Sequence, residues 1–175
     1  GGSVQNIDSN DGQYAETGLP PRTRRSAIAQ PFNNDYFLAY ITLEKAGSWG
    51  SLASTTSYVD HHVATTFDAT GFPNTAGPIR FDETVATTLL SHETRISGRG
   101  PHARWIVGVS AVHSVDLLQR RLGDPVAPPA ILGVRNEATE VALFGQYSRV
   151  ISSTLEITAG ARLNYAQALG EPLDQ

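Results

Sequence analysis

Asp60, His61 and His62 are consecutive, and their side chains are of the types that bind metal ions. Carboxylate and imidazole groups both ligate divalent metals. The surrounding residues predict an extended strand, however, and neighbouring side chains on a strand point to opposite faces. The two histidines therefore cannot readily hold one ion, and we predict no metal site. The remaining histidines are isolated in the sequence and are interpreted as interface or surface residues: His92, His102 and His113.

Ser91, His92 and Glu93 have the residue types of a hydrolase. Three consecutive residues cannot place a nucleophile, a base and an orienting carboxylate in line. No G-x-S-x-G motif occurs, and the chain has no cysteine, which excludes a thiolate nucleophile. An enzyme is thus the least favoured class of function, and we predict neither catalytic residues nor a cofactor.

The strongest periodic signal lies between Glu137 and Tyr165, where apolar and polar residues alternate. A period of two predicts β-strands. About eleven alternating residues at the end of this segment match the length of a tilted strand that crosses a bilayer. One face there carries Leu155, Ile157, Ala159, Ala161, Leu163 and Tyr165; the other carries Glu156, Thr158, Gly160, Arg162 and Asn164.

The same segment predicts a hairpin, because a second alternating run precedes a short turn over 149–153. Weaker alternation predicts four further strands, near 35–44, 49–61, 84–96 and 103–113. We predict an all-β fold, an antiparallel up-and-down meander of about six long strands. The segment Val115–Leu122 fits a short amphipathic helix, since Val115, Leu118 and Leu122 share a helical face.

Pro- and Gly-rich segments divide the predicted strands. We expect an irregular polar loop over 1–34, a strand-rich region over 35–166, and a loop or tail over 167–175. Long connections at 62–83 and 114–136 alternate with short turns. Short turns at one end and long loops at the other are typical of outer-membrane β-barrels.

The amino-acid composition further limits the classes of protein to which the chain can belong. With 40% hydrophobic residues and a mean hydropathy of -0.21, the chain contains no apolar run of the ~18 residues that predict a membrane helix. A net charge of -4 argues against a nucleic-acid partner. The local exception is a basic cluster, Arg22, Arg24 and Arg25, whose solvation in the first loop is favoured over binding to an anion. The absence of methionine, even at position 1, favours a piece of a longer or processed protein.

Four segments together resemble the barrel of TonB-dependent outer-membrane receptors: WGSLASTTSYVDH (49–61), LLSHETRIS (89–97), ARWIVGVSAV (103–112) and FGQYSRVISSTLEITAGARLNY (144–165). The resemblance covers roughly residues 35–166 and lies in the order of loose motifs. It implies a bacterial outer-membrane location and uptake of a scarce nutrient, such as a ferric chelate (siderophore), through a barrel of twenty-two strands. It also implies as partners outer-membrane lipid, a plug domain, the remaining barrel strands, the protein TonB and a small-molecule ligand.

The chain departs from this family because it has no recognisable plug and no energy-coupling box. We therefore expect it to be an internal fragment of the wall of a transmembrane β-barrel. In that wall, Glu93, Arg95, Glu156, Thr158, Arg162 and Asn164 would face the lumen. The alternating apolar face of the last strand, from Leu155 to Tyr165, would face lipid.

A soluble β-sandwich binding module is the alternative. Its apolar faces would meet across a core. Trp49, Trp105, Tyr58, Tyr147 and Tyr165 lie near the predicted strand ends, and would then anchor that core. In a barrel the same residues would form interfacial girdles.

Overall fold

The computed structural model describes residues 1–12, 15, 17–21, 23–71 and 77–173. Within these residues the backbone forms one antiparallel sheet of seven strands. The strands are β1 (Gly2–Ser9), β2 (Phe32–Gly47), β3 (Gly50–Asp68), β4 (Arg80–Arg99), β5 (Ala103–Gly123), β6 (Ala130–Ser152) and β7 (Leu155–Pro172).

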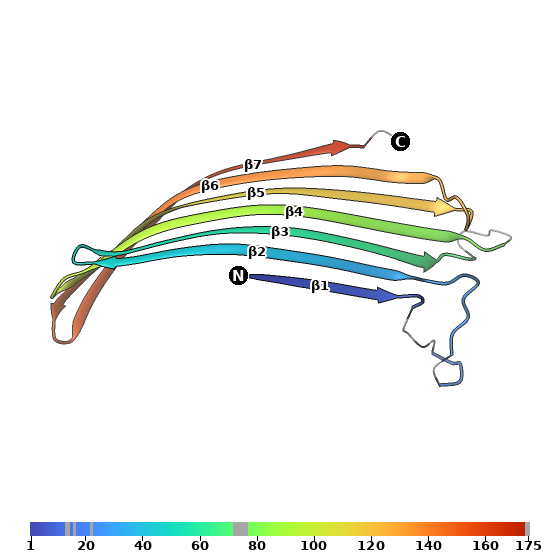
Figure 1. Cartoon of the computed structure of the whole chain (residues 1–175), viewed down its shortest axis with the longest axis horizontal. Coiled ribbons are helices and arrows are strands. Elements are labelled where there is room, and N and C mark those ends of the chain that lie inside the picture. Colours follow the sequence, from blue (N-terminus) through green and yellow to red (C-terminus); the bar gives the residue numbers. More distant parts are fainter. Residues whose placement is uncertain (13–14, 16, 22, 72–76, 174–175) are drawn as a thin grey trace.

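Each strand pairs with the next strand along the chain, which confirms the predicted antiparallel meander (Figure 1). Short turns at 48–49, 100–102 and 153–154 gather at one end of the sheet, and the connections 10–31, 69–79 and 124–129 gather at the other. We call these the short-turn end and the long-loop end. The sheet is open, because its edge strands β1 and β7 do not pair with each other.

Several predicted boundaries are wrong, and each error underestimates the extent of the strands. The predicted loop over 1–34 contains β1, the predicted tail after 166 continues β7 to Pro172, and the sheet has seven strands rather than six. The segment Val115–Leu122 is not a helix but part of β5, paired with β4 on one side and β6 on the other. Two ladders of backbone hydrogen bonds outweigh a weak helical pattern.

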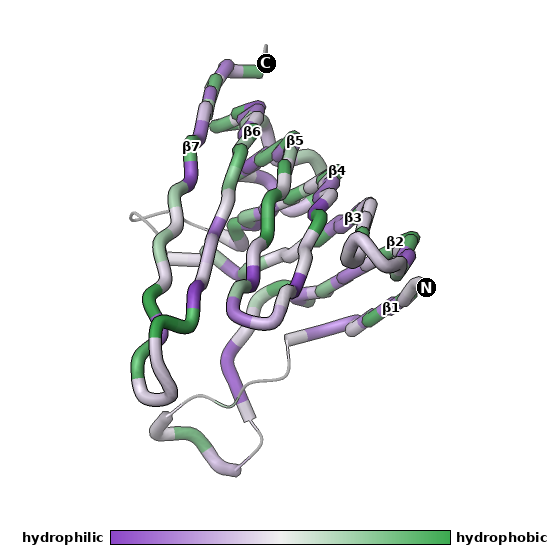
Figure 2. Tube along the Cα trace, turned by 90° about the vertical axis from the view of Figure 1, so that its left-hand side faces the viewer, coloured by the Kyte–Doolittle hydropathy of each residue, from purple (hydrophilic) through white to green (hydrophobic). Residues whose placement is uncertain are grey.

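The pairing register assigns every strand residue to one of two faces, because partners across an antiparallel pair project to the same side. Leu163 pairs with Leu143, which pairs with Val109, and so on across the sheet. We call the face that carries Leu163 the belt face and the face that carries Arg162 the opposite face. Hydrophobic and hydrophilic residues alternate along the strands as they switch between faces (Figure 2).

The two faces exchange polarity midway along the strands. In the short-turn half, the belt face is apolar; in the long-loop half, apolar residues instead lie on the opposite face, as in the paired row Val63, Val85, Leu118 and Val134. At the exchange point adjacent residues are both apolar, as at Leu89 and Leu90. The alternation of apolar and polar residues therefore breaks at this point. This break explains why the strands predicted from the sequence are too short.

No second layer of described residues covers the sheet. Among the described residues, Ala142 is the one hydrophobic side chain that is buried, at 2% exposure. Nor does any helix in the described part of the chain have the length and apolar character to span a membrane. The fold depends on strand pairing and on side-chain contacts within each face.

The turn between β2 and β3 requires a glycine. Gly50 has a φ of 137°, a conformation that side chains with a Cβ rarely adopt. A Cβ at this position would also overlap the carbonyl oxygen of Ser97 on β4. Gly50 thus allows the hairpin of β2 and β3 to pack closely against β4 at Ser97.

We expect Gly50→Ala to lower the free energy of unfolding by about 1 to 3 kcal/mol, because it adds backbone strain and a steric overlap. Urea titration of the chain measures this change. Gly145→Ala is the control, since its new Cβ would meet the nearest atom, the oxygen of Ile106, at an ordinary 3.5 Å. Equal stability of the two variants would contradict this account of the turn.

Candidate functional site

The belt face carries a largely apolar surface over the short-turn half of the sheet, which we call the apolar belt. Exposed side chains from six strands form it: Phe37, Ile41, Leu43, Tyr58, Leu90, Ile96, Trp105, Val107, Val109, Val141, Leu143, Tyr147, Leu155, Ile157, Leu163 and Tyr165. Leu163 and Tyr165 are 71% and 67% exposed. Soluble monomers rarely expose a contiguous apolar patch of this extent, so the belt marks a contact surface.

Aromatic rings lie at both margins of the apolar belt. Trp105 and Tyr147 are register partners near the short-turn end. At the other margin, Phe37 and Tyr58 contact each other with ring centroids 6.3 Å apart. Trp105, Tyr147 and Tyr58 each combine an apolar ring with one polar group, whereas the Phe37 ring is wholly apolar.

A small polar cluster interrupts the belt on β3 and β4. Thr56 bonds Nδ1 of His92 at 2.8 Å, Nε2 of His92 bonds Thr94 at 2.9 Å, and Thr94 bonds Ser54 at 2.8 Å. These side chains satisfy one another within the apolar surface. His92 is thus held in a hydrogen-bonded chain and is separated from Ser91 and Glu93, which project to the opposite face.

The opposite face at the same level is polar, and it carries all six residues predicted to line a lumen. Glu93 and Arg95 form an ion pair of 3.6 Å on β4, and Glu156 of β7 pairs with Arg104 of β5. Thr158 shares a 2.8 Å hydrogen bond with Ser148. Arg162 donates to Asn164 at 2.7 Å and pairs with Glu140 at 3.2 Å.

Arg162 is the best connected of these side chains. Its guanidinium lies 5.8 Å from the centroid of the Phe144 ring and reaches Ser110 two strands away at 3.4 Å. The Phe144 ring covers Gly108, where a Cβ would overlap it. A row of four paired residues, Arg95, Gly108, Phe144 and Arg162, therefore crosses the sheet.

The ion pairs contribute little to stability, because their side chains are about half exposed and such pairs give about 0.2 to 1 kcal/mol each. Sequence patterns missed three members of this network, Arg104, Glu140 and Ser110. Extending the alternation of β6 toward its start would have assigned Glu140 to the face of Arg162.

Hydroxyl groups pair across strands on the same opposite face. Four such pairs have oxygen separations of 2.6 to 3.1 Å: Thr42 with Thr55, Ser51 with Ser97, Ser57 with Ser91, and Ser148 with Thr158. In each pair either oxygen serves as the donor. This face is hydrophilic without carrying an excess of charge.

The other predicted candidates are not brought together. His61 and His62 lie on opposite faces, and His61 bonds Asn34 at 2.9 Å. No group of three metal-binding side chains occurs among the described residues. Of the basic cluster, Arg22 lies outside the described residues, and Arg24 forms an ion pair with Asp11.

Asp11 anchors the connection 10–31 at the long-loop end. Its carboxylate accepts the backbone N–H of Gln30 at 2.7 Å and pairs with Arg24. The Gln30 hydrogen bond, followed by Arg24, lowers the pKa of Asp11 below its ordinary value of 3.8. A second anchor is Asp68, which accepts a hydrogen bond from the Ser26 hydroxyl at 3.1 Å.

No protein-family model matches this sequence, and no curated protein matches it.

The anchor at Asp11 predicts a pH dependence. Because the folded-state pKa of Asp11 is lowered, its hydrogen bonds stabilise the connection above about pH 4, and this contribution is lost as the pH falls through the folded-state value. We expect protection of the Gln30 amide against hydrogen exchange, corrected for intrinsic rates, to decrease between about pH 6 and about pH 2.5.

Asp11→Asn should reduce that protection at about pH 6 and remove most of its pH dependence. Asp124→Asn is the control, because Asp124 accepts the Val126 amide at 2.8 Å in a different connection. Unchanged protection in Asp11→Asn would show that Asp11 does not hold this segment.

Proposed function

We propose that this chain is part of the β-barrel wall of a TonB-dependent outer-membrane receptor, which takes up a nutrient such as a ferric chelate. The observation that carries the proposal is the apolar belt, an exposed hydrophobic surface on one face of long antiparallel strands. It adds to the resemblance of four segments of the sequence to this family.

The dimensions of the belt support the proposal. On β7 the belt runs from Leu155 to Tyr165, which is about 34 Å along a strand that rises about 3.4 Å per residue. At the tilt of about 35° to 45° found in outer-membrane barrels, this length covers a height of about 24 to 28 Å. Such barrels carry an apolar band of about 25 Å between aromatic girdles.

The chemistry of the opposite face fits a lumen. Ion pairs and paired hydroxyls require water or protein partners, and the opposite face carries them at the level of the belt. The free edges of β1 and β7 would pair with further strands of the wall, because lipid cannot satisfy backbone groups. A plug domain, TonB and a small-molecule ligand complete the proposed set of partners.

The β-sandwich alternative receives no support from the arrangement of strands. A sandwich buries its apolar face against a second sheet. The described residues form one sheet, and its apolar belt is exposed.

The compartment tests the proposal directly. An antibody raised against residues 137–165, applied to fractions of the source cells, should detect a band in the outer membrane. Its mass should be several times the 18.8 kDa of this chain. A band near that mass in a soluble fraction would reject the receptor wall.

A pair of matched substitutions tests the assignment of faces. Ala161→Arg places a charge near the middle of the belt and should lower stability in the membrane by about 2 to 4 kcal/mol. Ala166→Arg places the same charge on the opposite face, beside Glu140, and should be tolerated. Urea unfolding in lipid vesicles measures both variants. Greater damage from Ala166→Arg would invert the assignment.

A further inference from the structure

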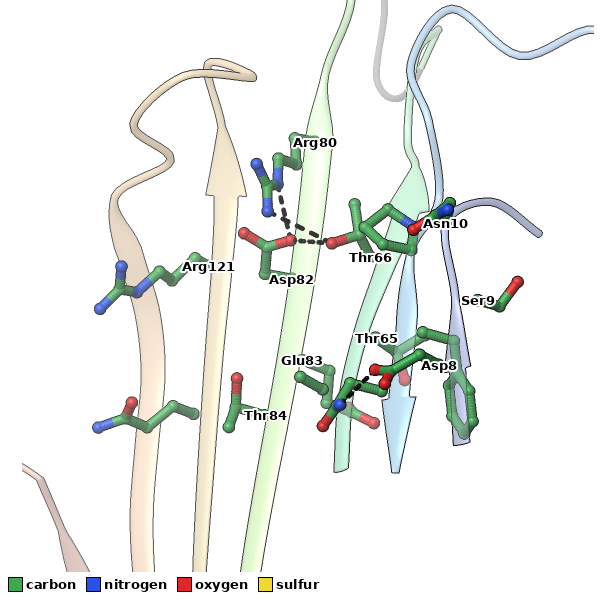
Figure 3. A pocket seen from close by; sticks show the side chains of 15 residues that line it. Asp8, Ser9, Asn10, Thr65, Thr66, Arg80, Asp82, Glu83, Thr84 and Arg121 are labelled. Atoms are coloured by element: carbon green, nitrogen blue, oxygen red, sulfur yellow. Dashed lines mark hydrogen bonds and ion pairs between the residues drawn. The ribbon is translucent and has the colours of Figure 1, made fainter. Parts of the chain in front are cut away.

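A polar pocket lies on the belt face at the long-loop end, beyond the apolar belt (Figure 3). It has a volume of about 660 Å³ and is open on one side. Five strands contribute to it, from β1 to β5, together with residues that begin and end the connection 10–31. Its position separates it from the ion pairs of the opposite face.

The polar groups at its centre are held in place before any ligand arrives. Thr66, which is buried at 7% exposure, donates to Asp82 at 2.6 Å. Arg80 donates to the same carboxylate at 2.8 Å and to the carbonyl oxygen of Pro125 at 3.3 Å. Figure 3 shows these side chains turned toward one another. Such a network lowers the entropy that a ligand must otherwise lose in ordering the site.

The lining excludes two classes of ligand. Twelve of the fifteen lining residues are polar or charged, which disfavours an apolar ligand. On the belt face two arginines stand against two carboxylates, Asp8 and Asp82, because Glu83 projects to the opposite face and pairs with Arg120. The pocket therefore carries no positive excess for a multiply charged anion.

What remains is a neutral ligand rich in hydroxyl groups. Each hydroxyl both donates and accepts, so it can bind carboxylates and guanidinium groups in one site. Asp82 offers acceptors, and Arg80 and Arg121 offer donors. Among the described residues no ion pair holds Arg121, so its donors remain for a ligand.

We propose that this pocket binds a saccharide. The source of the saccharide follows from the location of the pocket, and this step rests on the proposed function. The belt face of a barrel wall points outward, and the long loops lie outside the cell, so the pocket would meet the sugars of the surface glycolipid rather than the transported nutrient.

Calorimetric titration of the whole chain in neutral detergent micelles tests this site. The probes are dephosphorylated core oligosaccharide released from lipopolysaccharide, maltoheptaose as an unrelated glucan, and inorganic phosphate. We expect the core oligosaccharide to bind and phosphate not to bind. Saccharide binding in micelles does not depend on cell compartment, so its failure is distinct from failure of the fractionation test.

Asp82→Asn should weaken binding of the core oligosaccharide by about tenfold or more, because it removes a charged acceptor. The matched control is Asp116→Asn, since Asp116 likewise accepts a threonine hydroxyl at 2.6 Å but lies on the opposite face. Arg121→Gln, at an exposed position, should weaken binding without disturbing the central network.

Three outcomes overturn the proposal. Binding of phosphate alone would make the pocket an anion site. Binding of maltoheptaose without the core oligosaccharide would reject the surface glycolipid as the source. Equal affinity in Asp82→Asn, Arg121→Gln and Asp116→Asn would place any bound sugar elsewhere on the chain.

Discussion

Backbone hydrogen bonding between neighbouring strands is the interaction on which the rest of this structure depends. A sheet without a second layer gains little from burial, and one hydrophobic side chain in the described residues is buried. Paired residues therefore decide the chemistry of each face, because the register determines which side chains share it. A slip of one residue would move Leu163 and Tyr165 among the ion pairs and Arg162 into the belt.

The register also explains how one sheet carries three different surfaces. The same strands form the apolar belt, the polar part of the opposite face and the pocket, at different positions along their length and on different faces. Even neighbouring residues of β5 divide between these surfaces, because successive side chains of a strand point to opposite faces. Arg120 pairs with Glu83 on the opposite face, whereas Arg121 lines the pocket.

The sequence predicted those features of the fold that produce a regular alternation of apolar and polar residues. The hairpin of β6 and β7 follows from the alternation over 137–165. The polar side of β4 that carries Glu93 and the polar side of β7 that carries Arg162 follow from alternation within each strand. Strand extent was not predictable in this way, because β1 alternates Val4 and Ile7 across both faces and β4 changes its apolar face near Leu89. The pocket was also beyond reach, since Thr66, Arg80 and Arg121 meet only through pairing across three strands.

The paired hydroxyls of the opposite face determine how that face can form hydrogen bonds with a solute. In each of the four pairs the two oxygens exchange donor and acceptor roles by rotation of a hydrogen atom, without movement of heavier atoms. The opposite face can thus either donate a hydrogen bond to a solute or accept one from it, with almost no loss of free energy. Such a surface wets readily but discriminates poorly. Chemical selectivity on this face therefore depends on its fixed charges, which include Arg95, Arg104, Arg120 and Arg162 with their carboxylate partners.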